Sequence, residues 1–129
     1  MHFQRDAGNA LLTVLWCFIG AGIGEEMFFR GYVQSRVNES CGRPWHLLGV
    51  RFGWGLIVSS LLFGWIHALN TVDYFHGRFT FAWPYAIETC VVGLFYGVLR
   101  EKTGSLVAGI AVHGLVDIWA RVPDMTGLG

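Results

Sequence analysis

Four stretches of this chain are each long and apolar enough to be read as bilayer-spanning helices. A membrane-spanning helix needs about 20 mostly apolar residues. The stretches that approach this requirement are Ala7–Gly24, Phe52–Val72, Phe79–Leu99 and Thr103–Ala120. They lack the strict alternation of apolar and polar residues that is typical of a barrel strand. We therefore predict an all-α, polytopic membrane helix bundle of about four transmembrane helices, the first of which continues as helix toward Val37.

The composition supports a membrane protein over a soluble one. Charged residues make up 14% of the chain and hydrophobic residues 53%, whereas a soluble domain carries about 25% charged residues. The formal net charge is zero, so the basic surface that nucleic acid would require is missing. The first apolar stretch has no signal-peptide cleavage site, and no linker divides the chain. We expect residues 1–129 to form a single domain.

Arginine and lysine residues set the expected orientation. Short loops with an excess of these residues face the cytoplasm. With four spans, the connections after the first and the third span lie on one side, together with Arg36, Arg43, Arg51, Arg100 and Lys102. Only Arg5, Arg78 and Arg121 lie on the other side. The pattern predicts cytoplasmic connections and exoplasmic termini.

Ionisable residues inside the spans are the candidates for function, because charged groups at bilayer depth are costly and usually face a bundle interior or a cavity. They are Glu25, Glu26, Arg30, His67, Glu88, His113 and Asp117. Positions four apart share a helix face, as Glu26 with Arg30 and His113 with Asp117 do. Glu25 and Glu26 point in directions about 100° apart around the helix axis. One carboxylate can therefore pair with the arginine while the other faces a cavity.

Each of these features also has a purely structural explanation. A Glu–Arg pair at this spacing is more often an ion pair than a catalytic feature, and a lone buried histidine is more often a hydrogen-bonded core residue than a ligand. Glu88 stands alone on the third stretch and is left outside the catalytic set. The combination of two carboxylates, an arginine, two histidines and an aspartate on three spans favours a functional site.

Three motifs in this order resemble the CPBP intramembrane protease family, which includes the CAAX prenyl endopeptidases. Glu25-Glu26-Met27-Phe28-Phe29-Arg30 is similar to the family's EExxxR motif. Phe63-Gly64-Trp65-Ile66-His67 is similar to FxxxH, and His113-Gly114-Leu115-Val116-Asp117 to HxxxN or HxxxD. The resemblance covers Gly22 to about Trp119. Family members usually carry further helices before the first motif, so we expect a core domain that is truncated at its N-terminus or a minimal member that forms a homo-oligomer.

The resemblance implies an intramembrane endopeptidase, a metalloprotease or glutamic-type protease, in which Glu25 takes a proton from water and His67 holds that water. Glu26 and Arg30 would shape the site, and His113 and Asp117 would bind the oxyanion or orient the scissile carbonyl. An ionised Asp117 cannot donate a hydrogen bond, whereas the asparagine of related motifs can. Glu25, His67 and His113 are also a plausible zinc set. We favour the version with no cofactor, because the sequence has no HExxH motif.

By the same resemblance, the partners are the lipid bilayer and a protein or peptide substrate that is membrane-associated, C-terminally tagged or prenylated, and nucleic acid is not a partner. The expected location is a prokaryotic plasma membrane. One alternative is a non-catalytic membrane scaffold or bacteriocin-immunity-type protein that retains the polar site. Another is half of a proton-coupled transporter, since Glu, His and Asp chains also relay protons, although inverted repeats are missing.

Overall fold

One long helix forms the first third of the molecule. The computed structural model describes residues 7–69, 76–77 and 81–126. Within the long helix the segments follow one another without a break: α1 (Ala7–Leu15), η1 (Trp16–Glu25), η2 (Met27–Gln34) and α2 (Ser35–Cys41). Glu26 joins the two η segments with helical backbone angles. The η segments are π-helical, a geometry that is rare and often found at functional sites. The predicted continuation of the first helix past the glutamates is therefore present, and it extends four residues beyond Val37 to Cys41.

A short β-hairpin, which the sequence analysis did not predict, follows the long helix. β1 (Trp45–Leu47) pairs antiparallel with β2 (Val50–Phe52). The two turn residues, Leu48 and Gly49, have φ values of 51° and 80°, and a two-residue hairpin turn of type I′ requires positive φ at both positions. Phe52, the predicted start of the second helix, therefore ends the hairpin instead.

Three further helices complete the described fold: α3 (Trp54–Leu69), α4 (Trp83–Thr103) and α5 (Val107–Thr126). The predicted helix ends at Val72 and Phe79 lie outside the described residues. Pro84 stands in the first turn of α4, where its missing N–H has no helical partner to lose, so it does not interrupt that helix. Gly104 ends α4 in the left-handed conformation, with a φ of 68°.

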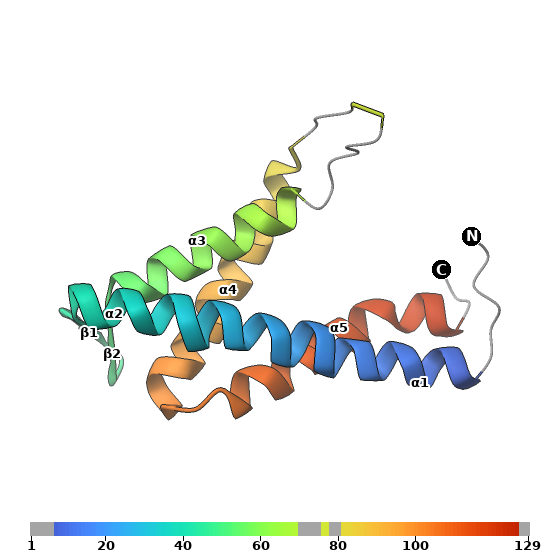
Figure 1. The fold of residues 1–129 in the computed structure, drawn as a ribbon, viewed down its shortest axis with the longest axis horizontal. Coiled ribbons are helices and arrows are strands. Elements are labelled where there is room, and N and C mark those ends of the chain that lie inside the picture. The colour runs from blue at the N-terminus through green and yellow to red at the C-terminus, as the bar shows by residue number, and fades with distance from the viewer. Residues whose placement is uncertain (1–6, 70–75, 78–80, 127–129) are drawn as a thin grey trace.

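The helices pack as two pairs that meet near the middle of the long helix (Figure 1). α3 lies beside α4, and α5 lies along η1. α3 also contacts η2 and α2, and α4 contacts α5 and η2. The α3–α4 pair leaves the long helix at an angle, while α5 follows its N-terminal half (Figure 1). The predicted all-α bundle is confirmed, with the hairpin as its only sheet among the described residues.

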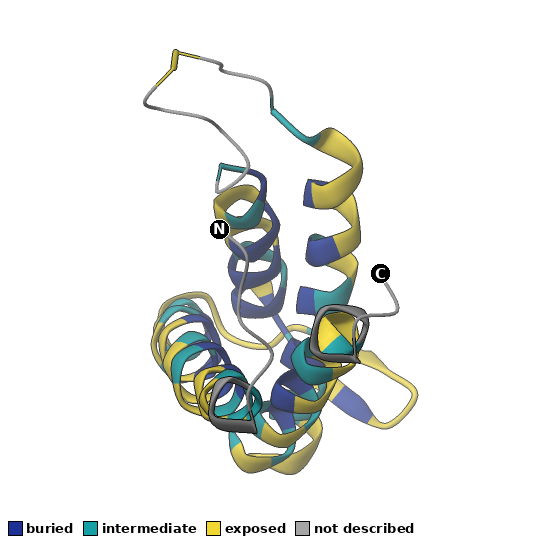
Figure 2. Cartoon of the chain, turned by 90° about the vertical axis from the view of Figure 1, so that its right-hand side faces the viewer, coloured by how far each residue is buried: buried dark blue, intermediate teal, exposed yellow. Residues whose placement is uncertain are grey.

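The faces that the helices turn toward one another are buried (Figure 2). Many of the residues on the outward faces are large and apolar. Trp16, Trp83, Val107 and Trp119 are each more than 60% exposed. A large exposed apolar surface marks a contact with another protein or with lipid. One helix among the described residues, Ala10–Cys41 with 32 residues, is long and apolar enough to cross a membrane, and α3 is apolar but shorter. The four-span arrangement stays a prediction.

Candidate active site

One carboxylate oxygen of Glu25 faces two histidines that come from two other helices. Oε2 of Glu25, at the end of η1, lies 3.6 Å from Nε2 of His67 on α3 and 3.8 Å from Nε2 of His113 on α5. The three residues are 42 or more positions apart in the sequence, so the packing of η1, α3 and α5 brings them together. The structure thus joins one residue from each of the three motifs.

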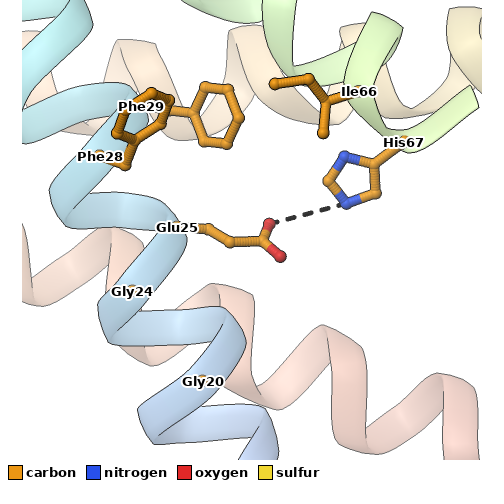
Figure 3. Close-up of a pocket in the computed structure, with 7 residues that line it drawn as sticks. All are labelled: Gly20, Gly24, Glu25, Phe28, Phe29, Ile66 and His67. Carbon is orange, nitrogen blue, oxygen red and sulfur yellow. Dashed lines mark ion pairs between the residues drawn. The ribbon is translucent and has the colours of Figure 1, made fainter. Parts of the chain in front are cut away.

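The ring of His67 is held so that its free nitrogen faces Glu25. Nδ1 lies 2.8 Å from the carbonyl oxygen of Phe63 on the preceding turn. A carbonyl oxygen only accepts hydrogen bonds, so Nδ1 carries the proton and donates it. In the neutral ring Nε2 is then an acceptor, and Nε2 is the nitrogen on the Glu25 side (Figure 3).

His113 is fixed in the same way, but its partner is a carboxylate. Nδ1 of His113 lies 3.1 Å from Oε1 of Glu26, and the ring stacks on Tyr96 with centroids 4.7 Å apart and planes at 22°. Oδ1 of Asp117 lies 3.9 Å from Nε2, on the side that faces Glu25. Glu26 thus holds the Nδ1 side of His113, and Asp117 stands beside Nε2, the nitrogen that faces Glu25.

Glu26 and Arg30 form a buried ion pair at the centre of the bundle. Both residues are fully buried, and Nη1 of Arg30 lies 3.2 Å from Oε1 of Glu26. Nη2 of Arg30 donates to the carbonyl oxygen of Gly93 at 2.9 Å. The guanidinium also lies 4.5 Å from the ring centre of Phe63 and 5.4 Å from that of Tyr96, within the range of cation–π attraction. Arg30 therefore binds Glu26, α4 and two aromatic rings at once.

An open pocket gives access to Glu25 and His67 (Figure 3). Its volume is about 310 Å³. The other lining residues are glycines on η1 and apolar side chains on η2 and α3, namely Gly20, Gly24, Phe28, Phe29 and Ile66. The pocket is thus an apolar groove with a carboxylate and an imidazole at one end, the composition that suits an apolar segment whose polar backbone is the reacting part.

The arrangement is equipped to activate water. Oε2 of Glu25 is buried and accepts no hydrogen bond from any residue that the structure describes. Its distances to the two histidine nitrogens exceed a direct hydrogen bond, so a water molecule beside all three would complete their hydrogen bonding. Glu88, in contrast, is exposed on α4, in agreement with its exclusion from the predicted set.

The geometry gives no support to the zinc set. In the described part of the chain, no group of three or more His, Cys, Asp or Glu side chains has an arrangement that could hold a metal ion. We therefore derive no step that involves a metal.

Sequence reasoning missed two contributors to this site. Tyr96 stacks on His113, and the carbonyl of Gly93 binds Arg30. Both belong to α4, which carries none of the three motifs, and the only charged residue of the corresponding stretch Phe79–Leu99 is Glu88. A glycine carbonyl leaves no signal in a sequence, and a lone tyrosine in an apolar helix leaves a weak one.

A family model described as Type II CAAX prenyl endopeptidase Rce1-like matches residues 7–119, which is most of the chain and includes all three motifs. No curated protein and no solved structure shows significant similarity to the chain.

Proposed function

Because the chain belongs to the Rce1-like family of type II CAAX prenyl endopeptidases, we propose that it is an intramembrane endopeptidase. Its substrate in this proposal is a membrane-associated protein with a prenylated or otherwise tagged C-terminus. The observation that carries the proposal is the approach of two histidine Nε2 atoms to one unpartnered carboxylate oxygen of Glu25.

In the proposed reaction, Glu25 is the general base. A water molecule donates one hydrogen to Oε2 of Glu25 and the other to Nε2 of His67. Glu25 takes its proton as the water oxygen attacks the scissile carbonyl carbon, and the carbonyl oxygen becomes an oxyanion. Glu25 then passes the proton to the leaving nitrogen, which breaks the peptide bond and yields a carboxylic acid and an amine. General-base participation of this kind typically contributes about 10²–10⁴-fold in rate.

His113 is the proposed donor to the oxyanion. Its Nδ1 proton is committed to Glu26, so donation from Nε2 requires the charged, doubly protonated ring. Glu26 supplies the counter-charge at 3.1 Å, and Arg30 holds Glu26 in place. A fixed donor aimed at the developing charge is worth about 10²–10³-fold in rate.

The apolar groove is the proposed place of the substrate segment next to the scissile bond. Gly20 and Gly24 contribute no side chains to its lining, and Phe28, Phe29 and Ile66 contribute apolar ones. The exposed apolar helix faces support the membrane as the place of this reaction. A multi-pass arrangement in a prokaryotic plasma membrane belongs to the same proposal.

The test uses purified protein in lipid vesicles and two fluorescence-quenched peptides that end in the same CAAX sequence, one farnesylated and one not. We expect wild-type protein to cleave at least one of them and Glu25→Gln to be about 10²–10⁴-fold slower. Glu39→Gln is the matched control, because Glu39 lies on the same helix and is exposed. Cleavage by Glu25→Gln at the wild-type rate, or no cleavage of either peptide by wild-type protein, overturns the proposal and favours the non-catalytic scaffold.

Metal dependence has a separate measurement. We expect metal analysis of the active protein to find no stoichiometric zinc and a chelator to leave the rate unchanged. Reversible loss of cleavage on chelation would instead assign Glu25, His67 and His113 as zinc ligands.

A further inference from the structure

Tyr96 carries a buried hydroxyl group whose hydrogen bonding is incomplete. The side chain is 1% exposed, and its hydroxyl oxygen has no hydrogen-bond partner among the residues that the structure describes. Burying a hydroxyl without a partner is unfavourable, and a phenylalanine would fill the same space without that penalty. A purely structural role therefore explains the ring but not the hydroxyl.

The ring of Tyr96 lies against the reactive part of the site. It stacks on the His113 ring with planes at 22° and meets the edge of Phe63 at a centroid distance of 6.4 Å. Asp117 contacts the same imidazole, because its Oδ1 lies 3.9 Å from Nε2 of His113. Tyr96 and Asp117 are therefore both neighbours of the His113 ring.

Asp117 presents a chemical difficulty at this position. Its ionised carboxylate accepts hydrogen bonds and cannot donate, so it competes with the oxyanion for the Nε2 proton of His113, from which it is 3.9 Å away. A second donor that binds the carboxylate removes this competition. The Tyr96 hydroxyl is a donor without a hydrogen-bond partner among the described residues, and its ring stacks on the same imidazole that Asp117 contacts.

We propose that Tyr96 is a positioning residue, whose ring fixes the plane of His113 and whose hydroxyl donates to Asp117 during the reaction. The hydrogen bond draws the carboxylate away from Nε2 of His113, which leaves that nitrogen free to donate to the oxyanion. Catalytic hydrogen bonds are often long without substrate and shorten when it binds. The inference rests on the proposed protease function.

The first test is Tyr96→Phe in the vesicle assay, with kcat, KM and thermal stability measured together. We expect kcat to fall about 10- to 100-fold, the range of a hydrogen bond to a charged group. We expect KM to stay at the wild-type value and the unfolding temperature not to fall, because the hydroxyl has no protein partner to lose. Tyr32→Phe is the matched control, since Tyr32 is 60% exposed on the long helix. A wild-type kcat for Tyr96→Phe overturns the proposal.

The second test asks whether Tyr96 acts through Asp117, by repeating Tyr96→Phe in an Asp117→Asn background. Asparagine is uncharged and donates by itself, so the effect of Tyr96→Phe should shrink to less than about threefold, a coupling that a double-mutant cycle measures. An equal loss in both backgrounds overturns the proposal. If Asp117→Asn is too slow to assay, infrared spectroscopy replaces the kinetic test. The carboxylate band of Asp117 is the one that disappears in Asp117→Asn, and we expect this band to shift in Tyr96→Phe. An unshifted band overturns the proposal.

The two proposals fail in different ways. Wild-type protein that cleaves neither peptide, or a Glu25→Gln variant at the wild-type rate, contradicts the protease function. If wild-type protein is active, Glu25→Gln is inactive and Tyr96→Phe is fully active, only the proposed role of Tyr96 is contradicted.

Discussion

Glu26 and His113 lie 87 positions apart in the chain, and their side chains are 3.1 Å apart at the centre of the fold. The contact joins the middle of the long helix to α5. It also joins the site to the ion pair of Glu26 with Arg30. The orientation of His113 and the packing of the bundle therefore depend on the same carboxylate, so stability and activity should respond together when this group changes.

Arg30→Ala should destabilise the protein as well as inactivate it. The substitution leaves the fully buried Glu26 carboxylate without its cation, and breaking a buried pair by removing one partner costs about 3–5 kcal/mol. Unfolding monitored by circular dichroism in detergent measures the change. Arg36→Ala is the control, because Arg36 and Glu39 form a comparable pair whose side chains are 67% and 62% exposed, and it should unfold like wild type. A stable but inactive Arg30→Ala would place Arg30 in contact with the substrate instead.

His67→Ala should lower the cleavage rate about as much as the loss of the base does, on the order of 10²-fold or more. Oε2 of Glu25, the proposed base, and Nε2 of His67, which positions the water, lie 3.6 Å apart. Each residue therefore depends on the other. The double variant with Glu25→Gln should be little worse than either single variant, because the two residues act as a unit. His46→Ala, at an exposed position of the hairpin, is the control. Independent, multiplying losses would contradict a shared water.

Much of the site could be predicted from the sequence because its residues lie on regular helices. Residues four apart share a helix face, and this rule alone paired Glu26 with Arg30, which form an ion pair at 3.2 Å. The same rule paired His113 with Asp117, whose Oδ1 lies 3.9 Å from Nε2 of His113. It could not show that Glu26, from another helix, contacts Nδ1 of His113. Contacts between distant positions depend on how helices pack, and helical spacing carries no information about that packing.

Features without a periodic pattern were also missed. The hairpin at 45–52 depends on positive φ values at Leu48 and Gly49, and Leu-Gly is a weaker turn signal than Asn-Gly. The sequence analysis assigned no role to Glu101. Its side chain is 4% exposed and accepts hydrogen bonds from Gln34, Asn38 and Arg43.

Glu101→Ala should therefore lower stability by at least about 2 kcal/mol, since it leaves buried side-chain donors without an acceptor. The donors lie 2.8 Å (Gln34), 2.6 Å (Asn38) and 2.7 Å (Arg43) from the Glu101 carboxylate. They come from η2, α2 and the segment before the hairpin, so the loss should loosen this end of the bundle. Denaturant unfolding measures it, with the exposed Glu39→Ala as control. Wild-type stability in Glu101→Ala would mean that water replaces the carboxylate.

Gly109→Ala should impair catalysis by displacing the carboxylate of Glu26. A Cβ atom at position 109 would lie 2.8 Å from Oε2 of Glu26, closer than real side chains approach. The carboxylate must move, and with it the Oε1 atom that holds His113 at 3.1 Å. A misplacement of about 1 Å in a catalytic group can cost on the order of 10²-fold in rate, whereas the overpacking itself costs about 1–3 kcal/mol. We therefore expect a folded protein with a lower unfolding temperature and a cleavage rate on the order of 10²-fold below wild type.

Ala111→Ser, at an exposed position two residues further along α5, should match wild type in both measurements. A wild-type rate in Gly109→Ala would show that the orientation of His113 does not depend on Glu26, and the role proposed for that carboxylate would then be wrong.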